Sequence, residues 1–363
     1  MFYYIFYEKL MHFFTPFNVF HYITFRAIMA SITGLAVSLY VASIAIPYLK
    51  RLNFKDQFKG YEPENHKHKS GTPTIGGVIF WSGFYVSSLL WARLDNVLVW
   101  ITLFGTALFI LIGFTDDYLK IKRGNNKGLS ARTKFALQTL SAALISYTIF
   151  KVESSLTHCS GCLYLPFIKH GIIQMGYLYI LFAMLVIVGT SNAVNLTDGL
   201  DGLATGPALT TIMPLIIFAY VSGNTIFAHY LHVPYIKGAG EISIMLAALG
   251  GSLLGFLWFN CYPAEVFMGD TGSLALGGFL GMVAVIIKEE IVLAIAGGIF
   301  VLETISVIIQ ILSYKTTGER VLKMAPLHHH YELNGWPESK VIVRFWIISI
   351  IFALLSLTAL KIR

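Results

Sequence analysis

The stretch "VLVWITLFGTALFILIGFTDDYLK" (residues 97–120) joins 19 uncharged, mostly apolar residues to two adjacent carboxylates, Asp116 and Asp117. A run of about 20 apolar residues has the length that an α-helix needs to cross the hydrocarbon core of a bilayer. The whole chain of 363 residues is 56% hydrophobic and only 12% charged. This pattern predicts an integral membrane protein that places two acids at one end of a transmembrane helix.

Similar apolar stretches recur along the chain, and their unbroken hydrophobicity favours helices over the alternating strands of a membrane barrel. We predict an all-α, polytopic fold of ten transmembrane helices in one integral-membrane domain, residues 1–363, without a separate soluble domain. The predicted spans are 23–48, 75–92, 97–115, 132–150, 177–194, 203–222, 242–259, 273–287, 291–314 and 341–360. The aromatic residues 1–22 lack a clear cleavage site, so we expect an interfacial segment there rather than a removed signal peptide.

The distribution of Lys and Arg predicts the orientation. Alternate loops hold 17 of the 26 Lys and Arg residues, and the positive-inside rule assigns these loops to the cytoplasm. Both termini then face outward. The net charge of +7 is explained mostly by this topology, so it does not indicate a nucleic-acid partner, although some basic residues remain to meet anionic lipids or substrates.

Acidic motifs gather on the predicted cytoplasmic side. They are "FTDDYLK" (114–120), "NAVNLTDGLDGLA" (192–204) and "NCYPAEVFMGDTGS" (260–273), and a triple histidine follows in "MAPLHHHYELNGWPESK" (324–340). A single acid at a helix end is often an ordinary cap or turn residue. Several such motifs on one side, two of them without Lys or Arg, instead indicate carboxylates that need a cation, and acids near a membrane are functional candidates.

The ligand types favour Mg²⁺. Carboxylates, Asn195 and Asn260 offer hard oxygen donors, and Mg²⁺ usually takes one or two carboxylates while substrate phosphates fill other positions. Three consecutive histidines do not have the spacing of a zinc site on one helical face. Because adjacent residues on a helix point about 100° apart, we expect Asp116 and Asp117 to have different tasks. The chain carries neither a P-loop nor a dinucleotide fingerprint.

Five stretches together resemble the phospho-N-acetylmuramoyl-pentapeptide transferases, within the superfamily of polyprenyl-phosphate N-acetylhexosamine-1-phosphate transferases. The resemblance runs over nearly the whole chain in order, and "GTPTIGG" and "PLHHHYE" point to the muramoyl-pentapeptide branch. The stretches are "HKHKSGTPTIGG" (66–77), "FTDDYLKI" with "GLSARTKF" (114–135), "NAVNLTDGLDGLA" (192–204), "AEVFMGDTGSLALGG" (264–278) and "PLHHHYE" (326–332).

The resemblance implies a reaction between UDP-N-acetylmuramoyl-pentapeptide and the membrane lipid undecaprenyl phosphate. The expected products are lipid I and UMP, the expected cofactor is Mg²⁺, and the expected location is the cytoplasmic face of the bacterial inner membrane. This would be the first membrane step of peptidoglycan synthesis.

The resemblance also implies roles for single residues. Asp116, Asp117, Asp270 and His328 are expected to be catalytic, with Asp270 as the Mg²⁺ ligand. A phosphate monoester has a second pKa of about 6, so the lipid nucleophile is largely ionised near neutrality and Asp116 is expected mostly to position it. The substrate-binding residues are expected to be Lys69, Thr74, Lys134, Asn195, Asp198, Asp201, Phe267, His329 and His330, with Asp201 and Phe267 near the uracil.

Several alternatives stay open from the sequence. A related transferase that uses UDP-N-acetylglucosamine is the nearer rival, and a cation-coupled transporter is a rival of another class. Cys159 and Cys162 form either a disulfide or two free thiols. The small-residue pairs Gly251/Gly255 and Gly277/Gly281 serve either packing within the chain or a homodimer seam.

Overall fold

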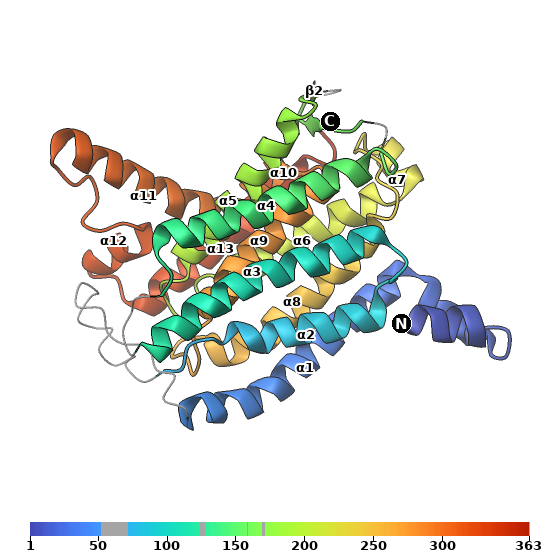
Figure 1. Cartoon of the computed structure of the whole chain (residues 1–363), viewed down its shortest axis with the longest axis horizontal. Helices are drawn as coiled ribbons and strands as arrows, with labels where there is room; N and C mark the ends of the chain where they lie inside the picture. Colours follow the sequence, from blue (N-terminus) through green and yellow to red (C-terminus); the bar gives the residue numbers. More distant parts are fainter. Residues whose placement is uncertain (52–71, 124–127, 158, 169–170, 363) are drawn as a thin grey trace.

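The computed structural model describes residues 1–51, 72–123, 128–157, 159–168 and 171–362, in which long helices form one bundle (Figure 1). Two short helical segments come first, the π-helix η1 (Tyr3–Leu10) and the 3-10 helix η2 (Thr15–His21). The α-helices that follow are α1 (Ile23–Arg51), α2 (Gly77–Trp91), α3 (Val97–Lys122), α4 (Ala131–Glu153), α5 (Leu178–Thr197), α6 (Thr205–Ser222), α7 (Thr225–Tyr230), α8 (Gly240–Asn260), α9 (Gly269–Ile287), α10 (Glu290–Ala296), α11 (Gly298–Thr317), α12 (Leu327–Leu333) and α13 (Glu338–Thr358).

The prediction of an all-α polytopic membrane protein is confirmed. Among the described residues, nine helices are long and apolar enough to cross a membrane, and the 15-residue α2 is a shorter apolar helix. The helices differ from the predicted spans in two places. Helix α3 continues past the predicted span end at residue 115 to Lys122, so Asp116 and Asp117 lie within its last two turns, at one end of the helix as the sequence predicts.

The span predicted over residues 291–314 is divided into α10 and α11. The division falls at Gly297, which is followed by Gly298, and glycine has a low helix propensity. A Cβ on Gly298 would lie 2.6 Å from the ring of Phe352, so α13 packs directly against the backbone at this point. Among the described residues one small sheet, which the sequence did not predict, pairs β1 (Cys162–Tyr164) with β2 (Ile172–Gln174). Cys159 and Cys162 form a disulfide beside it.

Helix α9 is the centre of the bundle. Every residue from Thr271 to Ile287 is buried, and α9 contacts α2, α3, α4, α5, α6 and α10. Because α9 is apolar on all sides, neighbouring helices can pack around its whole circumference. The polar first turn of α9 is therefore placed among the ends of its neighbours.

The two ends of the bundle hold different segments and different charged residues. In Figure 1 both chain termini lie at one end, whereas α12 and the end of α11 lie at the other. The terminal end includes the N-terminal segment, where the Tyr4 hydroxyl donates to Asp95 over 2.7 Å and Arg93 pairs with the same carboxylate. The hydrogen bonds from Arg93, assisted by Tyr4, hold the pKa of Asp95 at about 2. At this end the buried pair of Arg26 and Glu241 joins α1 to α8, and a different set of acids occupies the opposite end.

Candidate active site at the ends of α3 and α9

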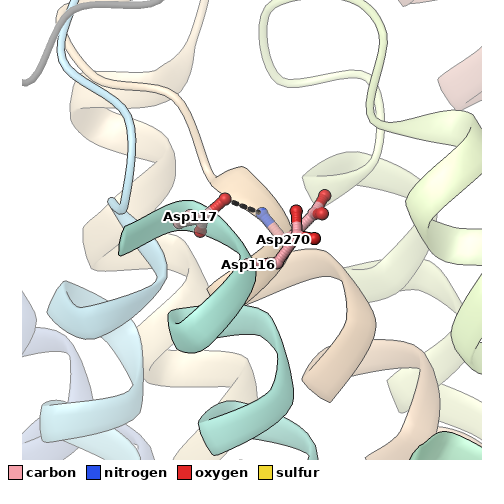
Figure 2. Close-up of side chains that lie close together, drawn as sticks. All are labelled: Asp116, Asp117 and Asp270. Atoms are coloured by element: carbon pink, nitrogen blue, oxygen red, sulfur yellow. Dashed lines mark hydrogen bonds between the residues drawn. The ribbon is translucent and has the colours of Figure 1, made fainter. Parts of the chain in front are cut away.

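Three carboxylates meet where the last turns of α3 reach the first turn of α9. Asp116, Asp117 and Asp270 each offer an oxygen, and these oxygens lie within 4.8 Å of one another. Figure 2 shows the three side chains between the two helices. The approach depends on Gly113, one turn before Asp116, because a Cβ there would lie 2.1 Å from the carbonyl oxygen of Asp270. We call this group the acidic cluster.

Two lysines insert their ammonium groups into the acidic cluster. Lys120 Nζ lies 2.6 Å from Asp116 Oδ2 and 3.0 Å from Asp270 Oδ2. Lys134 Nζ, from the first turn of α4, lies 2.6 Å from Asp270 Oδ2 and 3.3 Å from Asp116 Oδ2. Each ammonium therefore bridges the same two carboxylates. Buried charges are stable only when they are paired in this manner.

Asp116 and Asp117 point in different directions, as expected for neighbours on a helix. The Asp116 carboxylate faces the two lysines and accepts a hydrogen bond from the backbone N–H of Leu129 over 2.8 Å. The Asp117 carboxylate turns to the backbone of α9 and accepts from the N–H groups of Asp270 and Thr271. Both side chains are buried.

Asn195 in the last turn of α5 completes the surroundings of Asp270. Its Nδ2 donates to Asp270 Oδ1 over 2.8 Å and lies 2.8 Å from Ser273 Oγ. The Ser273 hydroxyl donates in turn to the carbonyl oxygen of Gly269 over 2.9 Å. Asp270 is thus held by an amide on one oxygen and by two ammonium groups on the other.

The segment before α2 is joined to the segment before α9. The N–H of Phe267 donates to Pro73, and the carbonyl oxygen of Phe267 accepts from Gly76, each over 2.8 Å. The Thr74 hydroxyl lies 2.9 Å from the position that a Cβ on Gly269 would take. Thr74 and the half-buried Phe267 are therefore placed next to the acidic cluster along the chain that leads into it.

The loop between α5 and α6 contacts other parts of the same end. Asp201 Oδ2 accepts from the N–H of Ala264 over 2.9 Å, and the N–H of Asp201 donates to Glu338 over 3.2 Å. Asp198 is the half-buried residue that ends α5, and its backbone N–H donates to Val194. The contacts of Asp201 thus tie this loop to the segment before α9 and to α13.

The three histidines lie on α12 and have separate contacts. His328 is buried, and its Nδ1 lies 3.2 Å from Glu303 Oε1 on α11. His329 Nδ1 lies 2.9 Å from Glu332 Oε2, and His330 Nδ1 accepts from the N–H of Lys323 over 3.1 Å. These contacts do not include the acidic cluster.

The Nε2 atom of His328 faces the α5–α6 loop. A Cβ on Gly199 would lie 2.3 Å from this nitrogen, so the loop can pass the imidazole only with a glycine at that position. His328 is therefore fixed by a carboxylate on one nitrogen and directed towards the "NLTDGLDG" loop by the other.

The structure brings together five of the residues expected from the sequence, Asp116, Asp117, Lys134, Asn195 and Asp270. Lys69 lies outside the described residues.

Sequence reasoning missed Lys120 and Glu303. Lys120 lies four residues after Asp116 and three residues after Asp117, a spacing that puts it on the same face of the helix as the acids. From the sequence we assigned it only to the positive charges that determine the membrane topology. Glu303 is a completely buried acid in an apolar helix, and such a residue is itself a signal of function.

The donor set fits a hard divalent cation together with a diphosphate. Carboxylate and amide oxygens are the ligands that Mg²⁺ prefers, and it commonly takes one or two carboxylates. The three carboxylates exceed the two ammonium groups by one negative charge, so a cation is favoured electrostatically. The same ammonium groups are suited to phosphate oxygens, since Lys binds phosphate as a compact positive charge.

A model of the glycosyl transferase family 4 matches residues 99–288. The match covers just over half of the chain, and it includes all of the acidic cluster, both lysines and the α5–α6 loop. The chain therefore belongs to glycosyl transferase family 4, and it is a multi-pass membrane transferase that passes a phospho-sugar to a polyprenyl phosphate.

Proposed function

We propose that this protein transfers phospho-N-acetylmuramoyl-pentapeptide from UDP-N-acetylmuramoyl-pentapeptide to undecaprenyl phosphate, giving lipid I and UMP. The observation that carries the proposal is the acidic cluster bridged by Lys120 and Lys134 at one end of a membrane bundle. The motifs "GTPTIGG" (71–77) and "PLHHHYE" (326–332) support the muramoyl-pentapeptide donor through their resemblance to that branch.

The reaction exchanges one phosphoanhydride for another. An oxygen of the lipid phosphate forms a bond to the phosphorus that carries the sugar. The bond from that phosphorus to the oxygen of UMP breaks, and UMP leaves with the electron pair. Since several negative charges meet in this step, charge neutralisation and in-line positioning supply most of the rate acceleration.

Asp116 and Asp270 would hold Mg²⁺, which when bound neutralises charge on the diphosphate. Their carboxylates share both lysines, and Asn195 fixes the second oxygen of Asp270. In the presence of substrate the two ammonium groups would turn from the carboxylates to phosphate oxygens. Asp116 then positions the lipid phosphate, which is largely ionised near neutrality and needs little help to lose a proton.

The donor would lie along the α5–α6 loop and the segment before α9. Asp201 and Phe267 are proposed to meet the uracil, with Asp198 and Asn195 along the diphosphate edge. Asp201 is supported for this role by its bond to Ala264, which holds both segments together. Thr74 and Lys69 would extend this surface from the segment before α2.

The histidines of α12 are proposed to contact substrate phosphates, with His328 as the catalytic member. Glu303 supports this role because it holds the Nδ1 side of the ring and leaves Nε2 directed at the α5–α6 loop. His329 and His330 would bind the outer part of the donor. The positive-inside rule supports a cytoplasmic location for the whole site, and the bacterial inner membrane is proposed from the resemblance.

The test is a donor comparison with purified protein. Undecaprenyl phosphate and Mg²⁺ are supplied with either UDP-N-acetylmuramoyl-pentapeptide or UDP-N-acetylglucosamine, and UMP release is measured. We expect release with the pentapeptide donor alone. Release with UDP-N-acetylglucosamine alone would assign the protein to the related branch, and release with neither donor would contradict the proposal.

A further inference from the structure

The first turn of α9 has backbone donors that its own N-cap residue does not satisfy. The first N–H groups of any helix lack partners within the helix, and a side chain at the N-cap usually accepts from the second or third of them. In α9 these groups belong to Asp270 and Thr271, and the N-cap residue Met268 makes no side-chain capping bond. Since Thr271 is completely buried, its N–H needs an acceptor from elsewhere in the protein.

Asp117 of α3 supplies that acceptor. Its Oδ1 accepts from the N–H of Asp270 over 3.1 Å, and its Oδ2 accepts from the N–H of Thr271 over 2.8 Å. The hydroxyl of Thr271 also donates to Oδ2 over 2.6 Å. In Figure 2 the side chain of Asp117 reaches the backbone of Asp270, whereas the carboxylates of Asp116 and Asp270 lie beside each other.

We infer that Asp117 is a positioning residue that caps α9 from a neighbouring helix and thereby sets the orientation of Asp270. An ionised carboxylate has about four acceptor sites, and three of those of Asp117 are filled by hydrogen-bond donors of α9. Its nearest ammonium contact, to Lys120, is 3.7 Å long, whereas Lys120 lies 2.6 Å from Asp116. The oxygens available to a cation or a phosphate therefore belong to Asp116 and Asp270.

The arrangement explains why this position requires two oxygens and a negative charge. A negative charge at a helix N-terminus is favoured by the helix dipole. An Asn side chain at position 117 would keep one acceptor oxygen but would direct an amide N–H against one of the α9 donors. A carboxylate avoids that conflict, and it ties the α3 backbone that carries Asp116 to the α9 backbone that carries Asp270.

The experiment compares Asp117→Asn, Thr271→Val and the double variant, with Thr271→Ser and Asp270→Asn as matched controls. Thr271→Val removes a donor to Asp117 and leaves the carboxylate in place. The readouts are the melting temperature of the metal-free protein, the binding of Mn²⁺ as a probe for Mg²⁺, and turnover. The inference rests on the proposed function only for the turnover readout, so melting and Mn²⁺ binding decide it even if no donor is accepted.

We expect Asp117→Asn to lower the melting temperature by about 1–3 °C, the shift that a lost helix cap produces in a chain of this length, and Thr271→Val, which loses only the hydroxyl hydrogen bond, to lower it less. The two effects should be less than additive in the double variant, since both variants alter the hydrogen bond between the Thr271 hydroxyl and Asp117. Thr271→Ser should keep the wild-type melting temperature and turnover. Turnover should fall by up to about 100-fold in Asp117→Asn, because misplacing a reacting group by 1 Å has that effect, and KM should change little.

Binding of Mn²⁺ separates a positioning residue from a ligand. Asp117→Asn should weaken Mn²⁺ binding by about 10- to 100-fold, as for a residue that acts through a ligand, whereas Asp270→Asn should abolish it. The inference is overturned if Asp117→Asn loses Mn²⁺ binding while its melting temperature is that of the wild type. It is equally overturned if Thr271→Val matches the wild type in both melting temperature and turnover.

Discussion

Lys120 and Lys134 each contact both Asp116 and Asp270, so these four side chains act as one unit. Removing one partner of such a buried set leaves charge uncompensated, which typically costs about 3–5 kcal/mol for a fully buried pair. The lysine side chains remain partly exposed, at 33% and 21%, and solvent screening makes the loss at this site smaller. A cation or a phosphate can therefore replace one of these contacts without unfolding the site.

Lys120→Met should bind Mn²⁺ more tightly than the wild type and should transfer phospho-sugar more slowly. The variant removes a positive charge that competes with the metal for Asp116 and Asp270, but it also removes a group that binds the diphosphate. We expect turnover to fall by roughly 100-fold, the usual effect of losing one preorganised electrostatic contact. Metal titration and UMP release measured on the same preparation check both parts, and weaker Mn²⁺ binding would contradict the assignment.

Asp116→Asn should have low activity at every pH between about 5 and 9. The lipid phosphate ionises with a second pKa of about 6 and does not need a base above that pH. If Asp116 serves to position the phosphate, its replacement therefore slows the reaction on both sides of this pKa. A pH–rate profile checks the expectation, and a full return of activity above pH 6 would show that proton removal is the task of Asp116.

At the scale of helices, close approach of backbones holds the bundle together, notably between α1 and α8. A Cβ on Gly251 would lie 1.9 Å from the carbonyl oxygen of Ser31, and a Cβ on Gly255 would lie 2.8 Å from that of Leu35. Gly277 and Gly281 similarly face the backbone of α5. Of the two uses left open by the small-residue spacing, packing within the chain is the one observed for both pairs.

Gly251→Ala should lower the free energy of unfolding by about 1–3 kcal/mol, as expected for an added methyl group in a tightly packed contact. Gly250→Ala is the matched control, since a Cβ at the adjacent position would meet only Ile212 at 3.7 Å. The control should be unchanged or more stable by up to about 1 kcal/mol, because alanine favours helices. Thermal unfolding of both variants in detergent measures the difference, and equal stabilities would contradict the packing described for α1 and α8.

At the scale of the whole molecule, the sequence predicted the parts that depend on local hydrophobicity. All ten predicted spans contain a helix, because a bilayer demands long apolar segments with internally bonded backbones. The division at Gly297 was missed, since it depends on the packing of Phe352 from a distant helix. The contact partners of Asp117 and Glu303 were not predicted for the same reason, because these partners are far away in sequence.

The assignment of the two ends to the two sides of the membrane can be tested with Cys261. This cysteine is free and exposed, in the loop between α8 and α9 that leads to the acidic cluster, and the other two cysteines form a disulfide. A membrane-impermeant maleimide should modify Cys261 in inside-out vesicles and not in right-side-out vesicles. Cys261→Ser is the control for background labelling, and labelling of right-side-out vesicles would reverse the orientation.

The central claim is that the acidic cluster joins a phospho-sugar to a polyprenyl phosphate, and the most direct test is to identify the lipid product. Wild-type protein and Asp270→Asn are incubated with undecaprenyl phosphate, UDP-N-acetylmuramoyl-pentapeptide and Mg²⁺, and the lipids are analysed by mass spectrometry. The account predicts that the wild type forms undecaprenyl diphosphate linked to N-acetylmuramoyl-pentapeptide, and that chelation or Asp270→Asn abolishes this product. Formation of the same product by Asp270→Asn at the wild-type rate would contradict it.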